Sequence, residues 1–235
     1  MRLADALTRL VGATAQDLAD ARADGVVLDS RRVRAGLVFA ALPGLKGHGL
    51  DHLEQALGRG AVAVLSDRPR PAGLSVPWIM SREARAHTAA LAWALAGDPQ
   101  RRLDLVGVTG TNGKSTTCHL VHTVLEEAGV GAALIGTLCY RLPNGDEVAA
   151  DRTTPEATEL APLLARTVAL GGRAAVMEAS SHALSQHRLD GLEFRVAVWT
   201  NLTRDHLDFH HDMEDYFAAK RRLFTERLAA DGRRV

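Results

Sequence analysis

A glycine-rich segment with a single lysine lies at residues 103–121, LDLVGVTGTNGKSTTCHLV. An apolar run precedes Gly110 and Gly113, and an amphipathic segment follows the lysine. Glycines let backbone N–H groups turn towards phosphate oxygens, and the N-terminus of a following helix favours an anion. Lys114 is then expected to contact the β- and γ-phosphates of a nucleotide, and Ser115 to bind Mg²⁺. The segment predicts a nucleotide-phosphate site and leaves the choice between ATP and GTP open.

This loop departs in one place from the usual phosphate-loop pattern, G-x-x-x-x-G-K-[ST]. Val108 occupies the position of the first glycine, with Gly107 and Gly110 on either side of it. The alternative is an ordinary glycine turn with an exposed lysine, and the predicted strand before the loop and helix after it argue against that alternative. We expect the apolar face of this helix to consist of Leu120, Val121, Val124, Leu125 and Ala128.

A second candidate is the acid that ends the apolar run RAAVME, residues 173–178. The run reads as a strand, so Glu178 falls at the carboxyl end of that strand. In a parallel sheet this end lies at the same edge as the phosphate loop, where a Mg²⁺–nucleotide would bind. Glu178 is therefore a candidate Mg²⁺ ligand, and the alternative is an ordinary acid in a surface ion pair.

A third candidate is the segment TNLTRDHLDFHHD, residues 200–212, which follows the predicted strand FRVAVW. Amide, carboxylate and imidazole groups crowd this one loop, and such a composition suits metal binding or proton transfer. Because no cysteine is close, the carboxylates favour Mg²⁺ over zinc. The polar side chains in question are Asn201, Asp205, His206, Asp208, His210 and His211, of which the last two need no function.

A lysine interrupts an apolar stripe in the predicted helix YFAAKRRLF, residues 216–224. Phe217, Lys220, Leu223 and Phe224 share one face of that helix. One interpretation is a lysine whose stem lies on the apolar surface while its ammonium group reaches water. The other is a partly desolvated lysine whose lowered pKa makes the amine reactive. The pattern does not distinguish them.

Bulk composition narrows the classes of partner. The 235 residues are 46% apolar, and 28 basic residues balance 28 acidic ones, so nothing calls for a nucleic acid or an acidic membrane. No apolar run reaches the ~18 residues that a membrane span needs, and the N-terminus has no signal-peptide pattern. Cys118 and Cys139 form no disulfide framework or metal-ligand pair. We expect a cytoplasmic protein and a monomer.

The order of predicted elements indicates an α/β protein with two domains. Short strands and helices fill residues 1–98, and GDPQRR then provides a hinge with Gly and Pro. From residue 99 onwards, strand, glycine loop, helix and strand follow one another as in an α/β nucleotide-binding domain with a mostly parallel sheet. The final residues, GRRV, look like the opening of another strand, so we expect this second domain to be truncated.

Five ordered segments resemble motifs of the Mur ligase family, namely TGTNGKST, TTPEA, EASSHAL, TNLTRDHLDFH and YFAAKRRLF. The resemblance extends over almost the whole chain, because VLDSRRVRAGLVFAALPG is similar to the N-terminal uridine-binding domain of the family. It is greatest to the members that add the third residue of the peptidoglycan stem peptide. The resemblance implies a UDP-sugar-binding domain over 1–98 and an ATP-binding domain over 99–235.

For the phosphate loop, the resemblance implies ATP rather than GTP. One Mg²⁺ would be held by Ser115 and Glu178, and a second by His206 and a carbamylated Lys220. With Lys114, the residues Glu178, His206 and Lys220 would be the catalytic set. The implied ATP-binding residues are Gly110, Thr111, Asn112, Gly113, Lys114, Ser115 and Thr116.

The implied reaction joins an amino acid, diaminopimelate or lysine, to UDP-N-acetylmuramoyl-L-alanyl-D-glutamate through an acyl-phosphate. Many relatives have Asn where this chain has Arg152, which changes one expected substrate contact. The implied substrate-binding residues are Leu28, Ser30, Leu45, Lys46 and Gly47, together with Thr153, Thr154, Ser180, Gln186 and Arg188.

Two alternatives to this activity remain at the level of sequence. One is a related ligase such as a folylpolyglutamate synthase, which shares the ATP loop but not the uridine-binding motif. The other is a non-catalytic module that binds the nucleotide and the UDP-sugar. Since family members carry a third domain, we expect this chain alone to be weak or inactive as a ligase.

Overall fold

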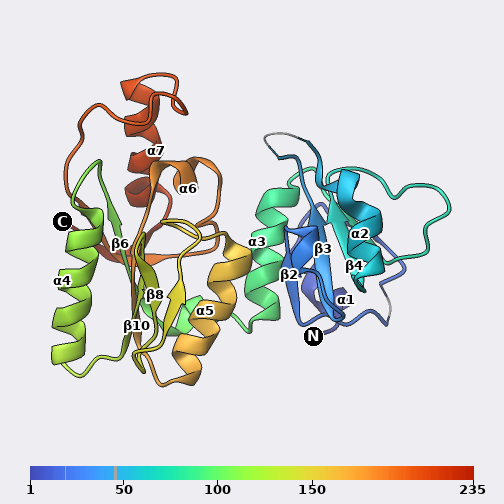
Figure 1. Ribbon diagram of the computed structural model, residues 1–235, viewed down its shortest axis with the longest axis horizontal. Helices are drawn as coiled ribbons and strands as arrows, with labels where there is room; N and C mark the ends of the chain where they lie inside the picture. Colours follow the sequence, from blue (N-terminus) through green and yellow to red (C-terminus); the bar gives the residue numbers. More distant parts are fainter. Residues whose placement is uncertain (19, 45–46) are drawn as a thin grey trace. The chain divides into compact units, whose positions relative to one another are not determined.

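The computed structural model describes residues 1–18, 20–44 and 47–235, and the chain divides into two compact units (Figure 1). The first unit comprises Met1–Asp98 and Ala157–Glu159, and the second comprises Pro99–Glu156 and Leu160–Val235. Each unit is built on its own β-sheet, and both sheets are mostly parallel. The predicted α/β fold class is therefore confirmed.

In the first unit, the sheet has five strands in the order β1-β5-β4-β3-β2, and only the β1–β5 pair is antiparallel. Its strands are β1 (Thr14–Gln16), β2 (Gly25–Val27), β3 (Leu37–Ala41), β4 (Ala63–Ser66) and β5 (Trp78–Met80). Its helical segments are α1 (Leu3–Leu7), η1 (Ser30–Arg32), η2 (Gly49–His52), α2 (Leu53–Gly58) and α3 (Ala84–Leu95).

The core of the first unit explains why its central strands are continuous apolar runs. Every residue of β3 and β4 is buried, as expected for parallel strands covered on both faces. Phe39, Val64 and Trp78 pack with Leu53 and Ala56 of α2. Figure 1 shows α3 on the opposite face of this sheet.

In the second unit, the sheet has seven strands in the order β12-β11-β6-β10-β7-β8-β9. The five strands from β12 to β7 are parallel, and β8 and β9 extend the sheet in antiparallel fashion. The strands are β6 (Asp104–Thr109), β7 (Ala132–Ile135), β8 (Cys139–Arg141), β9 (Glu147–Ala149), β10 (Ala174–Glu178), β11 (Phe194–Trp199) and β12 (Leu228–Arg234). The helical segments are η3 (Pro99–Arg102), α4 (Lys114–Glu127), α5 (Ala157–Ala169), α6 (Ser181–Ser185) and α7 (Met213–Thr225), and the first three residues of α5 are grouped with the first unit.

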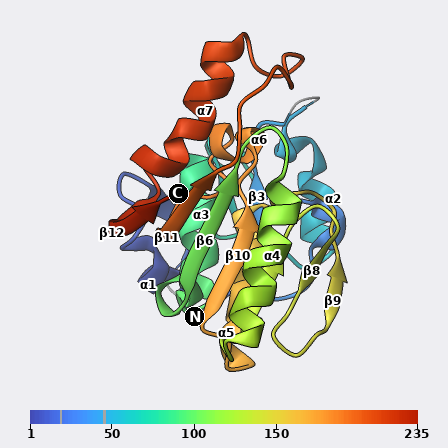
Figure 2. The same ribbon diagram turned by 90° about the vertical axis from the view of Figure 1, so that its left-hand side faces the viewer.

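Helix α4 packs against β10, β7 and β6, and Figure 2 shows it in front of β10. Cys118 and His122 form its buried face, with Val121 and Leu125 partly buried beside them. The predicted apolar face is therefore partly wrong, because Leu120 and Val124 are 64% and 67% exposed and Ala128 is also exposed. The sequence carries two overlapping stripes that share Val121 and Leu125, and the helix packs on the one that includes Cys118.

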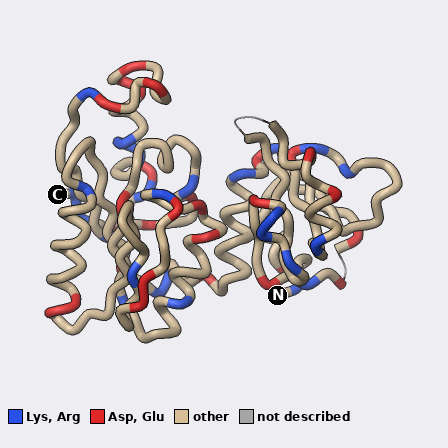
Figure 3. The backbone as a smooth tube through the Cα atoms, in the orientation of Figure 1, with Lys and Arg blue, Asp and Glu red and all other residues tan. Residues whose placement is uncertain are grey.

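Two further sequence expectations can be compared with this fold. The sequence pattern indicated that a strand opens within the last four residues. The structure has a strand there, β12, which spans Leu228–Arg234, begins earlier than expected and runs parallel to β11. Within the described ranges, no helix has the length and hydropathy to cross a membrane. Basic and acidic residues are interspersed along both units, as Figure 3 shows, in keeping with the balanced composition.

Candidate active site

Strands β6, β10 and β11 bring the predicted catalytic segments to one edge of the second sheet. β10 and β11 both pair with β6 in parallel, so the carboxyl ends of all three strands lie side by side. The phosphate loop follows β6, Glu178 ends β10, and the histidine-rich loop follows β11. Sequence-distant segments thus meet at the edge where ligands bind in open α/β sheets.

The phosphate loop begins at Gly110 and ends at Gly113, and both have positive φ, +143° and +83°. Gly113 is the N-cap of α4 and contributes no side chain to capping. The first-turn N–H groups of α4 have no carbonyl partner within the helix, so they are available to an anion. The Lys114 ammonium group folds back over the loop and donates to the carbonyl oxygens of Gly110 and Thr111 at 3.0 and 2.9 Å.

The segment TNLT after β11 holds the phosphate loop, a role that our sequence reasoning missed. Asn201 accepts from the Asn112 N–H through Oδ1 and donates to the Asn112 carbonyl oxygen through Nδ2, both at 3.0 Å. Its own carbonyl oxygen accepts from the Thr111 N–H at 3.0 Å. Thr200 donates to the same Asn112 carbonyl oxygen at 2.6 Å. The sequence offered an amide directly after a predicted strand as a signal, but it did not show that this strand lies next to β6.

Glu178 is 1% exposed and lies against the first turn of α4. Its Oε1 accepts from the Ser115 hydroxyl at 2.8 Å, from the Thr137 N–H at 2.9 Å and from the Thr137 hydroxyl at 3.2 Å. Gly136 allows this approach, because a Cβ atom there would lie 2.5 Å from Oε1. The surface ion pair considered as an alternative is therefore wrong, and Thr137 is a polar contact that the sequence pattern did not single out.

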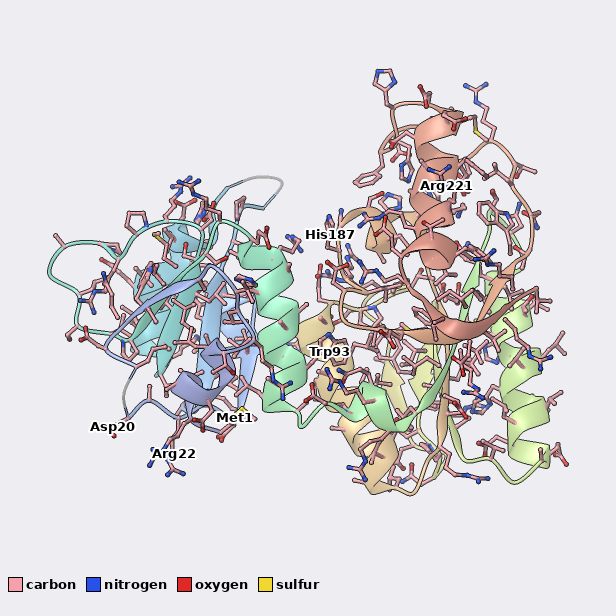
Figure 4. All side chains as sticks on the ribbon, turned by 180° about the vertical axis from the view of Figure 1, so that it is seen from behind. Met1, Asp20, Arg22, Trp93, His187 and Arg221 are labelled. Atoms are coloured by element: carbon pink, nitrogen blue, oxygen red, sulfur yellow. The ribbon has the colours of Figure 1, made fainter. Side chains whose placement is uncertain are left out.

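Lys220 is buried at 1% exposure, so the interpretation that its ammonium group reaches water is wrong. Its Nζ donates to the Gly110 carbonyl oxygen at 2.8 Å and lies 4.4 Å from the centre of the Tyr216 ring. Burial and, to a smaller extent, the nearby Lys114 together lower the pKa of Lys220 to about 7, while Asp205 opposes the change. The next residue on α7, Arg221, is exposed and identifies this helix in Figure 4.

His206 and His210 of the loop after β11 form one aromatic cluster with His182 of α6. His206 has a positive φ of +54°, a conformation that is uncommon for a non-glycine residue. Its ring packs edge-on to His182, with ring centres 4.9 Å apart, and the His182 ring lies 4.1 Å from that of Phe209. Burial, with the neighbouring histidines, lowers the pKa of His182. No group of three or more His, Cys, Asp or Glu residues in the described ranges could by itself hold a metal ion.

The two histidines expected to be bystanders differ from each other in the structure. His211 is exposed, whereas His210 is 1% exposed. The Nδ1 atom of His210 lies 3.2 Å from a carboxylate oxygen of Asp215. The backbone N–H of His210 donates to the His206 carbonyl oxygen at 2.9 Å, so this residue closes the turn that contains His206.

The predicted substrate-binding residues of the second unit lie together. Thr154 Oγ1 is 3.1 Å from Ser180 Oγ and donates to the Glu178 carbonyl oxygen at 2.7 Å. Arg188 donates to the Thr154 carbonyl oxygen at 3.0 Å and to Gln186 Oε1 at 2.5 Å.

The two residues before Thr154 make their own contacts. The hydroxyls of Thr153 and Thr137 are 3.0 Å apart, and Arg152 pairs with Glu156 at 3.1 Å. This polar group adjoins Glu178 at the end of β10.

Three of the predicted substrate-binding residues of the first unit lie in the described ranges, namely Leu28, Ser30 and Gly47. Leu28 follows β2 and is partly buried. The Ser30 side chain is 6% exposed and donates to Gln55 Oε1 at 2.6 Å. Gly47 accepts from the Gly44 N–H at 2.8 Å across a turn. Leu45 and Lys46 lie outside the described residues.

Comparison with known proteins gives matches over most of the chain. A family model described as Mur ligase middle domain matches residues 108–235, and one described as Mur ligase family, catalytic domain, matches residues 22–92. The UDP-N-acetylmuramoyl-L-alanyl-D-glutamate–2,6-diaminopimelate ligase of Geobacter sulfurreducens is 47% identical over 209 residues, covering 89% of this chain and 41% of the relative. The UDP-N-acetylmuramyl-tripeptide synthetase of Deinococcus radiodurans is 43% identical over 228 residues, covering 95% and 46%.

A solved structure of a UDP-N-acetylmuramoyl-L-alanyl-D-glutamate–2,6-diaminopimelate ligase shares the fold, with a TM-score of 0.73 and 32% sequence identity. The match covers 88% of this chain and 42% of that structure. The chain thus spans less than half the length of the relatives that it matches.

Proposed function

This chain belongs to the Mur ligase family. We propose that it acts as part of an ATP-dependent acid–amino-acid ligase that adds the third residue to UDP-N-acetylmuramoyl-L-alanyl-D-glutamate. The observation that carries the proposal is the convergence of Lys114, the Ser115–Glu178 pair and buried Lys220 at one sheet edge. The names of the relatives favour this function over folylpolyglutamate synthesis.

The proposed chemistry has two steps. An oxygen of the substrate carboxylate attacks the γ-phosphorus of ATP, the bond to the β-phosphate oxygen breaks, and an acyl-phosphate and ADP result. The amine of the incoming amino acid then attacks the acyl carbon, phosphate leaves, and an amide forms with loss of a proton. Activation is needed because a free carboxylate is a poor electrophile, whereas an acyl-phosphate has a good leaving group.

The phosphate loop supplies positive charge to the transferring phosphoryl group. We assign ATP binding to Gly110–Thr116, where the first-turn amides of α4 are available to an anion and Asn201 fixes the loop. Lys114 now donates to two loop carbonyls, and a bound phosphate would compete for the same ammonium group. Charge complementarity at the γ-phosphate then lowers the barrier to transfer.

Mg²⁺ fits the residues at the end of β10. The Ser115 hydroxyl and the Glu178 carboxylate are hard oxygen donors 2.8 Å apart at the start of α4. Mg²⁺ is commonly held by one or two protein oxygens together with phosphate oxygens and water, so a larger protein cluster is not required. When bound, the ion would neutralise charge on the β- and γ-phosphates.

Lys220 is proposed to be carbamylated and to hold a second Mg²⁺ together with His206. Its depressed pKa leaves a large fraction of neutral amine near pH 7, and only the neutral amine adds to carbon dioxide. The ammonium group first loses one proton, and addition of carbon dioxide to the neutral amine then forms the N–C bond with loss of a second proton, so a buried cation becomes an anion. The carbamate nitrogen keeps one N–H, so the hydrogen bond to Gly110 can persist.

Substrate-binding residues are proposed in each unit, and each set is described by itself. In the second unit, the group around Thr154 and Arg188 adjoins Glu178, which places a cation and several hydroxyls next to the proposed phosphoryl-transfer site. We assign the UDP-sugar to the first unit, with Leu28, Ser30, Leu45, Lys46 and Gly47 as the expected contacts. The Ser30 hydroxyl donates its hydrogen to Gln55, so we expect it to meet the substrate as a hydrogen-bond acceptor.

Isothermal titration of the 235-residue chain with Mg²⁺–ATP tests the nucleotide site directly. Lys114→Ala should weaken binding at least tenfold, whereas Arg221→Ala, an exposed cation on α7, should leave the affinity unchanged. Phosphate release by a longer protein that contains this chain, supplied with ATP, UDP-N-acetylmuramoyl-L-alanyl-D-glutamate and diaminopimelate, tests the reaction, because ligation by this chain alone is expected to be weak or absent. Nucleotide binding without ADP formation, with all substrates supplied, would instead indicate a non-catalytic binding module.

A further inference from the structure

Tyr216 is fully buried at the first turns of α7 and lies between the phosphate loop and the histidine-rich loop. Its hydroxyl oxygen is 3.1 Å from Thr111 Oγ1, although the two residues are 105 positions apart. A phenylalanine would fill the same apolar space, so the hydroxyl is the feature that packing alone does not require.

The hydrogen bonds of Thr111 identify Tyr216 as the donor in this pair. The Thr111 hydroxyl donates its one hydrogen to the Thr203 carbonyl oxygen at 3.1 Å. Its oxygen accepts from the Thr203 N–H at 2.9 Å, which leaves one lone pair for the Tyr216 hydroxyl. Burial raises the pKa of Tyr216, so the phenol keeps this proton at neutral pH.

The same geometry shows that the Thr111 side chain does not face the nucleotide. Its hydroxyl is fully used by Thr203 and Tyr216, and its backbone N–H donates to the Asn201 carbonyl oxygen at 3.0 Å. Thr111 therefore connects the phosphate loop to the protein interior. Loss of this hydrogen bond would therefore affect the binding of a phosphate only indirectly, by changing the shape of the phosphate loop.

The ring of Tyr216 also contacts the other two parts of the site. Lys220, one turn later on α7, places its Nζ 4.4 Å from the ring centre. The His206 ring lies edge-on with centres 6.0 Å apart, and the His210 ring centre is 5.2 Å away. One side chain thus borders the phosphate loop, the buried lysine and the histidine-rich loop.

We propose that Tyr216 is a positioning residue that holds the phosphate loop in its nucleotide-binding shape by donating a hydrogen bond to Thr111. The part of this inference that concerns nucleotide affinity rests on the function proposed above. The hydrogen bond joins the loop to α7, so the position of Lys220 and the shape of the loop are set together.

Four variants and one control test the inference in the 235-residue chain. Tyr216→Phe removes the donor, Thr111→Val removes its acceptor, and the double variant removes both. Thr111→Ser keeps the hydroxyl and serves as the conservative rescue. Tyr140→Phe is the matched control, because Tyr140 is 5% exposed and its hydroxyl donates to the Arg152 carbonyl oxygen at 2.7 Å, away from the loop.

For Mg²⁺–ATP, titration calorimetry should give an affinity about 5- to 10-fold weaker in Tyr216→Phe, the size expected for one lost hydrogen bond. The double variant should be no weaker than Thr111→Val alone, and Thr111→Ser and Tyr140→Phe should bind as wild type. Wild-type affinity in Tyr216→Phe would overturn the proposal. So would a double variant whose fold-loss of affinity equals the product of the losses in Tyr216→Phe and Thr111→Val.

Amide hydrogen exchange provides a readout that needs no nucleotide. Exchange at Thr111 and Asn112 should be several-fold faster in Tyr216→Phe than in wild type and unchanged in Tyr140→Phe, at equal stability to urea. Unchanged exchange in Tyr216→Phe would overturn the positioning role. If wild type bound no ATP, the proposed function would fail, and the exchange data would still decide whether Tyr216 holds the loop.

Discussion

The ammonium nitrogen of Lys220 lies 2.8 Å from the carbonyl oxygen of Gly110, 110 positions earlier in the chain. The same carbonyl oxygen accepts from Lys114 at 3.0 Å, so two lysines share one backbone acceptor. A buried cation beside a second cation is costly, and both effects lower the pKa of Lys220. The fold therefore produces a reactive amine next to the proposed phosphate site.

Carbamylation of Lys220 can be detected without any activity measurement. We expect the chain equilibrated with ¹³C-bicarbonate to show one carbamate resonance by ¹³C NMR, because the neutral amine adds carbon dioxide. Lys220→Met should lose the resonance, and Lys114→Met should retain it. A signal that survives Lys220→Met would assign the carbamate elsewhere.

Ligation by a protein that contains this chain should fall at least 100-fold in Lys220→Met, since the second Mg²⁺ loses an anionic ligand.

Gly110→Ala should damage both stability and nucleotide binding. A Cβ atom at this position would overlap Thr200 Oγ1 and approach the Asn201 backbone to 3.1 Å, and the φ of +143° disfavours any side chain. We expect a loss of about 1–3 kcal/mol in the free energy of unfolding and an ATP affinity at least tenfold weaker.

Gly145→Ala is the matched control for that substitution. Gly145 also has a positive φ, +84°, but a Cβ atom there would have no neighbour within 4 Å. The Gly145→Ala variant should lose stability through backbone strain and keep its ATP affinity. Equal nucleotide binding by Gly110→Ala and wild type would show that the close approach to Thr200 does not shape the loop.

The sequence was sufficient for those parts of the site that depend on one segment. The glycine loop, the acid that ends β10 and the striped lysine were each identified from local pattern, and the structure brings them to one edge because parallel strands end there. The buried state of Lys220 was left open, since a stripe does not show whether a neighbouring element covers it.

Parts of the site that depend on strand order could not be predicted. Asn201 and Tyr216 contact the phosphate loop across 89 and 105 positions, and these contacts follow from β11 lying next to β6 rather than next to its sequence neighbour β10. The apolar face of α4 was misassigned for a related reason. Two stripes were compatible with helical spacing, and only the position of the sheet selects the one with Cys118.

Glu178→Gln should remove the Mg²⁺ dependence of nucleotide binding. The amide keeps the size of the side chain and one oxygen for Ser115 and Thr137, but it carries no charge. We expect ATP affinity measured with Mg²⁺ to fall at least tenfold, and affinity measured with EDTA to stay the same or to rise. Glu126→Gln, which affects an exposed acid on α4 that accepts from the Ala132 N–H, is the control. An unchanged Mg²⁺ effect in Glu178→Gln would remove this acid from the metal site.

Because of His122, the free energy of unfolding should decrease as the pH becomes acidic. The residue is 6% exposed on α4, its Nε2 lies 3.2 Å from the Ala132 carbonyl oxygen, and burial lowers its pKa. The unfolded chain, with a histidine pKa of about 6.5, then binds a proton at a higher pH than the folded protein does. Stability is therefore intact above about pH 6.5 and is lost as the pH falls towards the folded pKa, by at most about 1.4 kcal/mol per pH unit.

Urea unfolding between pH 5 and pH 8 measures this contribution of His122. His122→Gln keeps a polar side chain near Ala132 but cannot take up a proton, so its free energy of unfolding should fall less steeply on acidification. The wild-type and variant curves should therefore diverge below about pH 6.5 and run parallel above it. Parallel curves over the whole range would mean that the buried imidazole does not resist protonation, and that its hydrogen bond to Ala132 accommodates the charged form.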